Sequence, residues 1–210
     1  MDGIAQPRQQ RSRESFARVR AATLSLMAEH GAAGVTIADV SERAGVSVGT
    51  IYGRVGNRAN LLRTVQEEEL ARIQASMVAT LAALEADGAA TVESIVDAYV
   101  QGMASSAPTL RSLVQLAAAQ QELDAAGPAA WREMREVIMG SLERASDVVV
   151  APSSDSWRSW VYEVLDAATF QYLESSTPQS AAGQRRLVKN LIRTARLLLE
   201  AGEGPVGASE

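Results

Sequence analysis

The sequence predicts an all-α protein of about nine helices, with a small N-terminal helix-turn-helix domain ahead of a larger helical bundle. Three observations predict this fold. Apolar residues recur at three- and four-residue spacing between Gly and Pro breaks, no stretch of useful length alternates as a strand would, and only 4% of the 210 residues are aromatic. The chain is long enough for two cores of unequal size.

The composition excludes several kinds of chemistry. The chain has no cysteine and one histidine, so disulfides, thiol catalysis and cysteine-ligated metal sites are excluded. The single histidine, His30, falls in the last turn of a predicted helix, where an imidazole favours the negative end of the helix dipole. The N-terminus has no apolar signal region and the chain has no long apolar run, so we expect a soluble, cytoplasmic protein without membrane contact.

The net charge of −5 hides a division along the chain. Residues 1–58 hold eight arginines against five acidic residues, which gives +3, whereas residues 59–210 hold twelve basic against twenty acidic residues, which gives −8. A basic head on an acidic body is typical of a DNA-binding domain attached to a domain that does not touch DNA.

The first sixty residues divide at glycines. Residues 1–12 are polar and contain several arginines, which predicts a mobile arm, and a first helix runs from about residue 12 to Gly31. Thr36 is placed to cap a short helix that ends at Gly45, with Asp39 as its acidic capping partner. Ser47 then caps a second short helix over residues 48–55, before Gly56 breaks the chain.

The rest of the chain predicts six further helices, separated by Pro and Gly. They cover residues 58–85, 91–106, 108–125, 128–150, 156–175 and 181–201. We divide the chain into a flexible basic arm, a helix-turn-helix domain, a larger helical domain and a disordered tail: residues 1–12, 13–58, 59–202 and 203–210.

Residues 36–58 have side chains suited to a DNA-binding helix-turn-helix; their sequence is TIADVSERAGVSVGTIYGRVGNR. Ala44 and Gly45 are small enough for two short helices to cross closely, and in such a unit the second helix enters the major groove. Hydroxyls, a basic side chain and a helix N-terminus suit phosphates, and Val48 suits a thymine methyl. The predicted DNA-binding residues are Thr36, Ser47, Val48, Gly49, Thr50, Tyr52, Arg54 and Arg58. The alternative is that this unit serves packing alone.

Over about residues 15–65 these motifs resemble the tetracycline-repressor (TetR) family. The matching segments are AATLSLMAEHG, TIADVSERAGVS, GTIY and NRANLL. Two positions depart from the family pattern: Val55 replaces an aromatic residue, and Gly53 replaces a larger one that relatives direct at DNA. We therefore expect DNA-sequence specificity to depend more on Val48, Thr50, Arg54 and the arm. Two alternatives stay open for Arg8, Arg11 and Arg13 of the arm: they reach the minor groove or backbone, or they are simply solvated.

The resemblance implies that the C-terminal half binds an effector and forms a homodimer. Two amphipathic helices near the C-terminus predict the dimer interface, with Trp157, Trp160, Val161, Val164, Ala168, Leu187, Leu191, Ala195 and Leu198 on their apolar stripes. Bulky residues of the middle helices are candidates for an effector pocket: Tyr99, Met103, Leu116, Trp131, Met134, Ile138 and Phe170. Both sets also fit a plain core.

The sequence thus predicts a repressor that binds palindromic double-stranded operator DNA as a homodimer and is released by a small hydrophobic or aromatic effector. An activator, or a regulator without a small-molecule effector, is the alternative that the sequence leaves open. The chain has no Gly-rich phosphate loop, zinc spacing or nucleophile arrangement, so we predict no catalytic residue, metal or cofactor.

Overall fold

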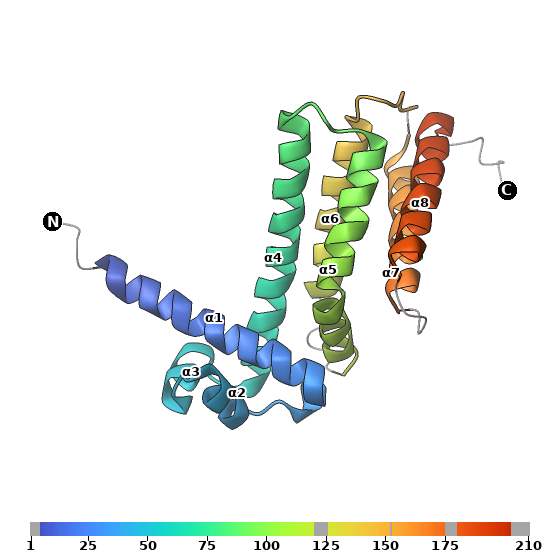
Figure 1. The fold of residues 1–210 in the computed structure, drawn as a ribbon. Coiled ribbons are helices and arrows are strands. Elements are labelled where there is room, and N and C mark those ends of the chain that lie inside the picture. The colour runs from blue at the N-terminus through green and yellow to red at the C-terminus, as the bar shows by residue number, and fades with distance from the viewer. Residues whose placement is uncertain (1–4, 120–125, 152, 175–179, 203–210) are drawn as a thin grey trace. The chain divides into compact units, whose positions relative to one another are not determined.

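A computed structural model describes residues 5–119, 126–151, 153–174 and 180–202, and these residues contain helices but no strand (Figure 1). The prediction of an all-α protein is confirmed. The described residues form eight α-helices and one short 3-10 helix, η1. Their bounds are α1 Ala5–His30, η1 Ala32–Gly34, α2 Ile37–Ala44, α3 Val48–Val55, α4 Arg58–Ala86, α5 Val92–Ala119, α6 Ala126–Glu143, α7 Asp155–Glu174 and α8 Ala181–Ala201.

The chain gathers into two compact units, which we describe separately. Unit 1 comprises residues 1–72 and 108–129, and unit 2 comprises residues 73–107 and 130–210. Helices α4 and α5 each run through a unit boundary. The division at residue 58 that the sequence suggests stays a prediction, and the tail at 203–210 lies outside the described residues. Among the described residues, no helix has both the length and the apolar character needed to cross a bilayer.

The helix count differs from the prediction at Pro108. The predicted helices at 91–106 and 108–125 are one helix, α5, with Pro108 in its interior. A proline removes one backbone hydrogen bond and crowds the preceding turn, yet a helix continues through it when its packing outweighs that cost. Pro108 is exposed, and the residues on either side of it, Ala107 and Leu110, are buried. Burial of the flanking apolar residues therefore keeps the helix intact.

Two further boundaries differ from the prediction. Helix α1 begins at Ala5, so residues 5–12 are helical where the sequence predicts a mobile arm. Helix α6 ends at Glu143 instead of near residue 150. In the chain that follows α6, the Asp147 carboxylate accepts a hydrogen bond from the N–H of Val92 at 2.8 Å, and the Ser146 N–H donates to the Ala90 carbonyl at 2.9 Å. This segment caps the start of α5, which ends α6 early.

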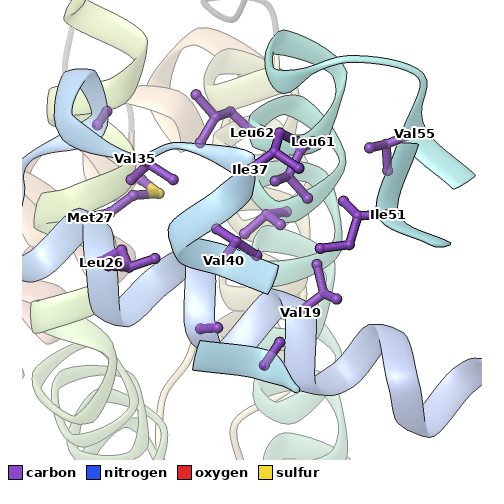
Figure 2. Packing of buried hydrophobic residues seen from close by; sticks show 14 of the residues in the cluster. Val19, Leu26, Met27, Val35, Ile37, Val40, Ile51, Val55, Leu61 and Leu62 are labelled. Carbon is purple, nitrogen blue, oxygen red and sulfur yellow. The ribbon is translucent and has the colours of Figure 1, made fainter. Parts of the chain in front are cut away.

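The core of unit 1 combines residues of α1, α2, α3, the start of α4 and the end of α5. Val19, Leu26 and Met27 of α1 lie against residues of α2 and α3, with Leu61 and Leu62 of α4 on the other side (Figure 2). Leu113 and Leu116, from the last turns of α5, complete the cluster. The named side chains of α1, α4 and α5 are at most 4% exposed, and those of α2 and α3 in the cluster are at most 8% exposed.

Unit 2 is built from the second half of α4, the first half of α5, α6 from Ala130 onward, α7 and α8. Helices α7 and α8 pack against each other. Helices α4 and α5 approach closely at Gly102, where an added Cβ would lie 2.6 Å from the Met77 Cε atom. Buried side chains such as Ile95, Leu142 and Leu165 fill the interior.

Gly45 and Gly53 provide a test of the backbone in the helix-turn-helix. Gly45 ends α2 with φ 61° and ψ 39°, a left-handed conformation that disfavours a Cβ. We expect Gly45→Ala to lower the free energy of unfolding by about 1 kcal/mol, because the strain falls on the folded state. Urea unfolding measures this change.

Gly53→Ala is the matched control. Gly53 lies inside α3 with no heavy atom within 4 Å of an added Cβ, so alanine should raise the free energy of unfolding by about 0.5–1 kcal/mol. Equal effects of the two substitutions would show that the backbone at Gly45 is unstrained.

Candidate nucleic-acid interface

Side-chain caps position the two short helices of unit 1. The Thr36 Oγ1 atom accepts a hydrogen bond from the Asp39 N–H at 3.1 Å and donates to the Asp39 carboxylate at 2.6 Å. The Ser47 Oγ atom accepts from the Thr50 N–H at 3.2 Å. Both caps are those that the sequence predicts, and they set where α2 and α3 begin.

Helix α3 presents one buried and one exposed face. Ile51 and Val55 lie in the core at 2% and 8% exposed, whereas Val48 and Tyr52 are 40% and 47% exposed. Six predicted DNA-binding residues are exposed together on this helix and its cap: Ser47, Val48, Gly49, Thr50, Tyr52 and Arg54. The Ser47 and Thr50 hydroxyls lie 2.7 Å apart. The structure therefore brings this part of the predicted set together in solvent.

The Arg54 side chain is held against α1. Its guanidinium lies 3.9 Å from the centre of the Phe16 ring, a cation–π contact. The Nη1 atom donates to the Ser12 carbonyl at 3.3 Å and to the Ser12 hydroxyl at 3.2 Å. A surface groove of about 550 Å³ between α1 and α3 is lined by these groups together with Arg11 and Thr50. The cation is thus positioned in advance beside the exposed face of α3.

Arg58 has a structural role that its sequence position did not suggest. Its Nε atom donates to the Val35 carbonyl at 2.6 Å, and its Nη2 atom donates to the carbonyls of Ala32 and Ala33. These carbonyls belong to the segment that leads from α1 into α2. The phosphate contact stays a prediction, because Arg58 already uses several donors to tie the start of α4 to this segment.

Other arginines of the basic head also bond within unit 1. Arg18 donates to the Ala44 carbonyl at the end of α2, at 3.1 Å. Arg20 lies 3.7 Å from the carboxylates of both Glu68 and Glu69 on α4. Glu69 is only 2% exposed, so Arg20 compensates a carboxylate that would otherwise be buried with fewer partners. Several of the arginines counted in the sequence therefore hold the domain together.

Unit 2 contains a buried polar cluster that includes two of the predicted effector residues. The Tyr99 hydroxyl donates to the Asp166 carboxylate at 2.5 Å, and the Trp131 indole N–H donates to its other oxygen at 3.1 Å. The Tyr162 ring lies 6.0 Å from the Tyr99 ring and 5.1 Å from the Trp131 ring, centre to centre. One carboxylate is thus surrounded by three aromatic side chains.

Burial changes the acidity of this cluster. It raises the pKa of Asp166, although the hydrogen bonds from Tyr99 and Trp131 act in the opposite direction. The pKa of Tyr99 is raised well above its usual value, chiefly by burial and then by the neighbouring Tyr162 and Asp166. Tyr162 and Asp166 are not among the effector residues that the sequence predicts. The signal present in the sequence was the four-residue spacing between them, which places an acid on the buried face of α7.

The remaining effector candidates do not form one group. Met103, Met134 and Ile138 are buried and Phe170 is half-buried, all in unit 2. The structure differs from the prediction at Leu116, which lies in unit 1 and packs in the helix-turn-helix core. The cause is the continuation of α5 through Pro108, which carries its last turns into the other unit.

The predicted dimer stripes divide between interior and surface. Val161, Leu191 and Ala195 are buried in their own unit. Trp160 is 45% exposed, and Leu197, which the prediction omitted, is 63% exposed. The remaining residues are half-buried: Trp157, Val164, Ala168, Leu187 and Leu198.

The N-terminal part of the chain matches the model of a known protein family. Residues 19–65 match the family model "Bacterial regulatory proteins, tetR family". No curated protein matches the chain significantly. Among the described residues, no group of three or more His, Cys, Asp or Glu side chains is arranged to hold a metal ion.

Solved structures of similar fold span nearly the whole chain. A proposed transcriptional regulator from Streptomyces coelicolor A3(2) is 20% identical, with a TM-score of 0.65, over 87% of this chain and 98% of its own. A proposed TetR-family regulator from Mesorhizobium loti MAFF303099 is 13% identical, with a TM-score of 0.71, over 90% and 96%. The regulator FadR from Bacillus subtilis, in complex with stearoyl-CoA, is 14% identical, with a TM-score of 0.62, over 88% and 97%.

Glu29 provides a test of the electrostatics of unit 1. Arg43 and Ser25 donate hydrogen bonds to its carboxylate, and these lower its pKa from 4.5 to about 2, Arg43 having the larger effect. A carboxylate whose pKa is lower in the folded state stabilises that state above its unfolded pKa, and this contribution is lost as the pH falls. We expect the loss between pH 4.5 and about 2. An NMR titration of the Glu29 carboxyl, with urea unfolding at each pH, measures it.

The variant Glu29→Gln should show a smaller loss of stability over the same pH range. Glu67→Gln is the control, since Glu67 is exposed on α4 and forms no ion pair among the described residues. A Glu29 carboxyl that titrates near 4.5 would contradict the hydrogen bond from Arg43.

Proposed function

This chain carries the DNA-binding domain of the TetR family on a TetR-type helical fold, and on that premise we propose that it is a transcriptional repressor. It binds a palindromic operator in the cytoplasm as a homodimer and leaves the operator when a small effector binds. The observation that carries the proposal is the exposed face of α3, where Val48 and Tyr52 project from a helix whose other face is fully packed.

Each group on α3 suits a particular part of the duplex. In a helix-turn-helix the N-terminal part of the second helix meets base edges, while hydroxyls and cations meet phosphates. Val48 in the first turn fits a thymine methyl, and Tyr52 fits a phosphate because its hydroxyl has no hydrogen bond within the described residues. Arg54, held on the Phe16 ring, adds a cation at a fixed place.

A homodimer explains how one small domain reaches useful affinity. Two recognition helices about 34–36 Å apart read successive major grooves of a palindromic site. Trp160 on α7 and Leu197 on α8 are large, apolar and exposed, and half-buried Val164, Ala168 and Leu198 lie on the same two helices. Covering this face with its copy removes the apolar surface from water.

The effector proposal is supported by the interior of unit 2. The cluster around Asp166 supplies polar groups within a mostly apolar interior, which is the composition of a small-molecule site. The structure of Bacillus subtilis FadR contains stearoyl-CoA, a ligand with a long apolar chain. Helices α4 and α5 run through the unit boundary. A ligand that prefers the form of unit 2 that is wrong for DNA must weaken DNA binding by the same factor.

Tyr52 tests the proposed interface. We expect Tyr52→Phe to weaken binding to DNA from upstream of the protein's own gene about three- to tenfold, because it removes one phosphate contact and leaves the ring in place. Tyr52→Ala and Thr50→Ala should weaken it further. Fluorescence anisotropy at two salt concentrations, with scrambled DNA for comparison, measures the affinity.

Tyr172→Phe is the matched control: it makes the same chemical change in unit 2, where the hydroxyl donates to the Ser180 carbonyl at 3.1 Å. It should leave DNA affinity unchanged. If the three α3 variants bind both DNAs as the native protein does, the helix-turn-helix is not the binding surface. The same assay then screens apolar and aromatic compounds for release, and none would be found for a regulator without an effector.

Leu197 tests the dimer. We expect Leu197→Glu to shift the protein from dimer to monomer, because it places a charge within the proposed apolar interface. Sedimentation equilibrium measures the mass. Val78→Glu is the control, since Val78 is also exposed and apolar but lies on α4. A dimer that persists in Leu197→Glu would place the interface elsewhere.

A further inference from the structure

A second surface groove lies in unit 2, between the first turns of α5 and the first half of α8. Its volume is about 740 Å³, within the range of small-molecule sites. Figure 1 shows the two helices that border it, α5 in green and α8 in red. None of the predicted effector or dimer residues lines this groove.

The two walls of the groove carry opposite charges at matching intervals. Glu93, Asp97 and Gln101 line it from α5, and Arg185, Lys189 and Arg193 line it from α8. Residues four apart lie on one helix face, so each wall is a ridge: two acids followed by the neutral Gln101 on α5, and three bases on α8.

These charges have no partners among the described residues. Elsewhere in unit 2 acids and bases do pair: Arg158 donates to Glu143 at 2.6 Å, and Arg144 donates to Glu85 at 2.7 Å. Across the groove, no acid of the α5 ridge lies within 4.0 Å of a base of the α8 ridge among the described residues. Such a gap suits a ligand that carries both charges.

The base of the groove supplies apolar contact and one unsatisfied donor. Val188 is 9% exposed and Ile192 is half-buried. The Nε2 atom of Gln184, in the first turn of α8, is buried and has no hydrogen-bond partner among the described residues. Buried polar atoms without a partner are uncommon and unfavourable. An acceptor atom of a bound ligand satisfies this amide, on the same side as the basic ridge.

The groove is distinct from the predicted dimer face. Leu187 follows Arg185 by two residues, which is about 200° around the helix. Leu197 follows Arg193 by four residues and continues the line of the basic ridge one turn beyond the groove. A homodimer formed through Leu187, Leu197 and Leu198 therefore meets α8 beside the C-terminal end of the groove, and Arg185 and Lys189 lie about two to three turns away from Leu197.

We propose that this groove binds a zwitterionic small molecule with an apolar middle, of the size and charge of a short apolar peptide. Its carboxylate lies against Arg185, Lys189 and the Gln184 amide, its ammonium group lies against Glu93 and Asp97, and its apolar part covers Val188 and Ile192. This site goes beyond the proposed function, because neither DNA binding nor the Asp166 cluster enters the argument.

Three probes of nearly equal shape test the charge requirement by isothermal titration calorimetry on the full chain. They are the dipeptide leucyl-leucine, its N-acetylated form, which keeps only the carboxylate, and its C-terminal amide, which keeps only the ammonium group. We expect leucyl-leucine to bind at least about tenfold more tightly than either blocked form. Equal binding of all three probes, or no binding up to about 10 mM, overturns the proposal.

Charge variants then locate the site. Lys189→Glu should weaken leucyl-leucine binding about tenfold or more, because it places a like charge beside the ligand's carboxylate, and Asp97→Lys should weaken it similarly, because it places a like charge beside the ammonium group. Gln184→Leu should weaken binding without lowering the melting temperature, since it removes a donor that has no partner within the described residues.

Arg186→Glu is the matched control, because Arg186 is an exposed base of α8 outside the groove. It should leave affinity unchanged. If Lys189→Glu and Arg186→Glu weaken binding equally, the attraction is a general effect of net charge and the groove is not the site. None of these groove variants needs to change DNA affinity. A negative result for peptide binding therefore contradicts the groove proposal without contradicting the repressor proposal.

Discussion

The short length of α2 and α3 is the constraint on which unit 1 depends. Each has eight residues, too few for an isolated helix to be stable in water. Their stability must come from the shared core, where Val40, Ala44 and Ile51 pack against the long helix α1 and the start of α4 (Figure 2). Packing uses one face of each short helix, and the face of α3 that remains is the one available to DNA.

Polar groups tie these packed elements together at a few points. Arg58 bonds to carbonyls between α1 and α2, and Arg18 bonds to the last carbonyl of α2. Backbone carbonyls at helix ends lack partners inside the helix, so an arginine side chain satisfies them and also fixes the connection. In unit 2, Asp166 is partnered in the same way by Tyr99 and Trp131. Buried polar groups here set relative positions that apolar contacts alone leave free.

The charge distribution gives the arginines of the head two roles. A protein of net charge −5 attracts DNA only where basic groups gather. Several arginines of unit 1 bond within the protein, yet their charges persist, so Arg54 on the Phe16 ring still contributes to the local potential. In unit 2 several arginines pair with nearby acids, whereas Arg185 and Arg193 of the α8 groove form no ion pair among the described residues, and the ligand proposal depends on this.

Local signals in the sequence determined the helical class, the caps at Thr36 and Ser47, the glycine end of α2 and the family of the head, because each depends on neighbouring residues. Tertiary structure decided where local signals conflicted with packing. Pro108 by itself predicts a helix break, but the burial of apolar residues on either side of it keeps α5 continuous. The last turns of α5, with Leu116, therefore belong to unit 1. Asp147 ends α6 early by capping α5, and Asp166 gains its partners from α5 and α6. The apolar stripes of α7 and α8 contain both buried and exposed residues for the same reason. Periodicity identifies an apolar face of a helix, but only the neighbouring elements decide which residues of that face remain exposed to water.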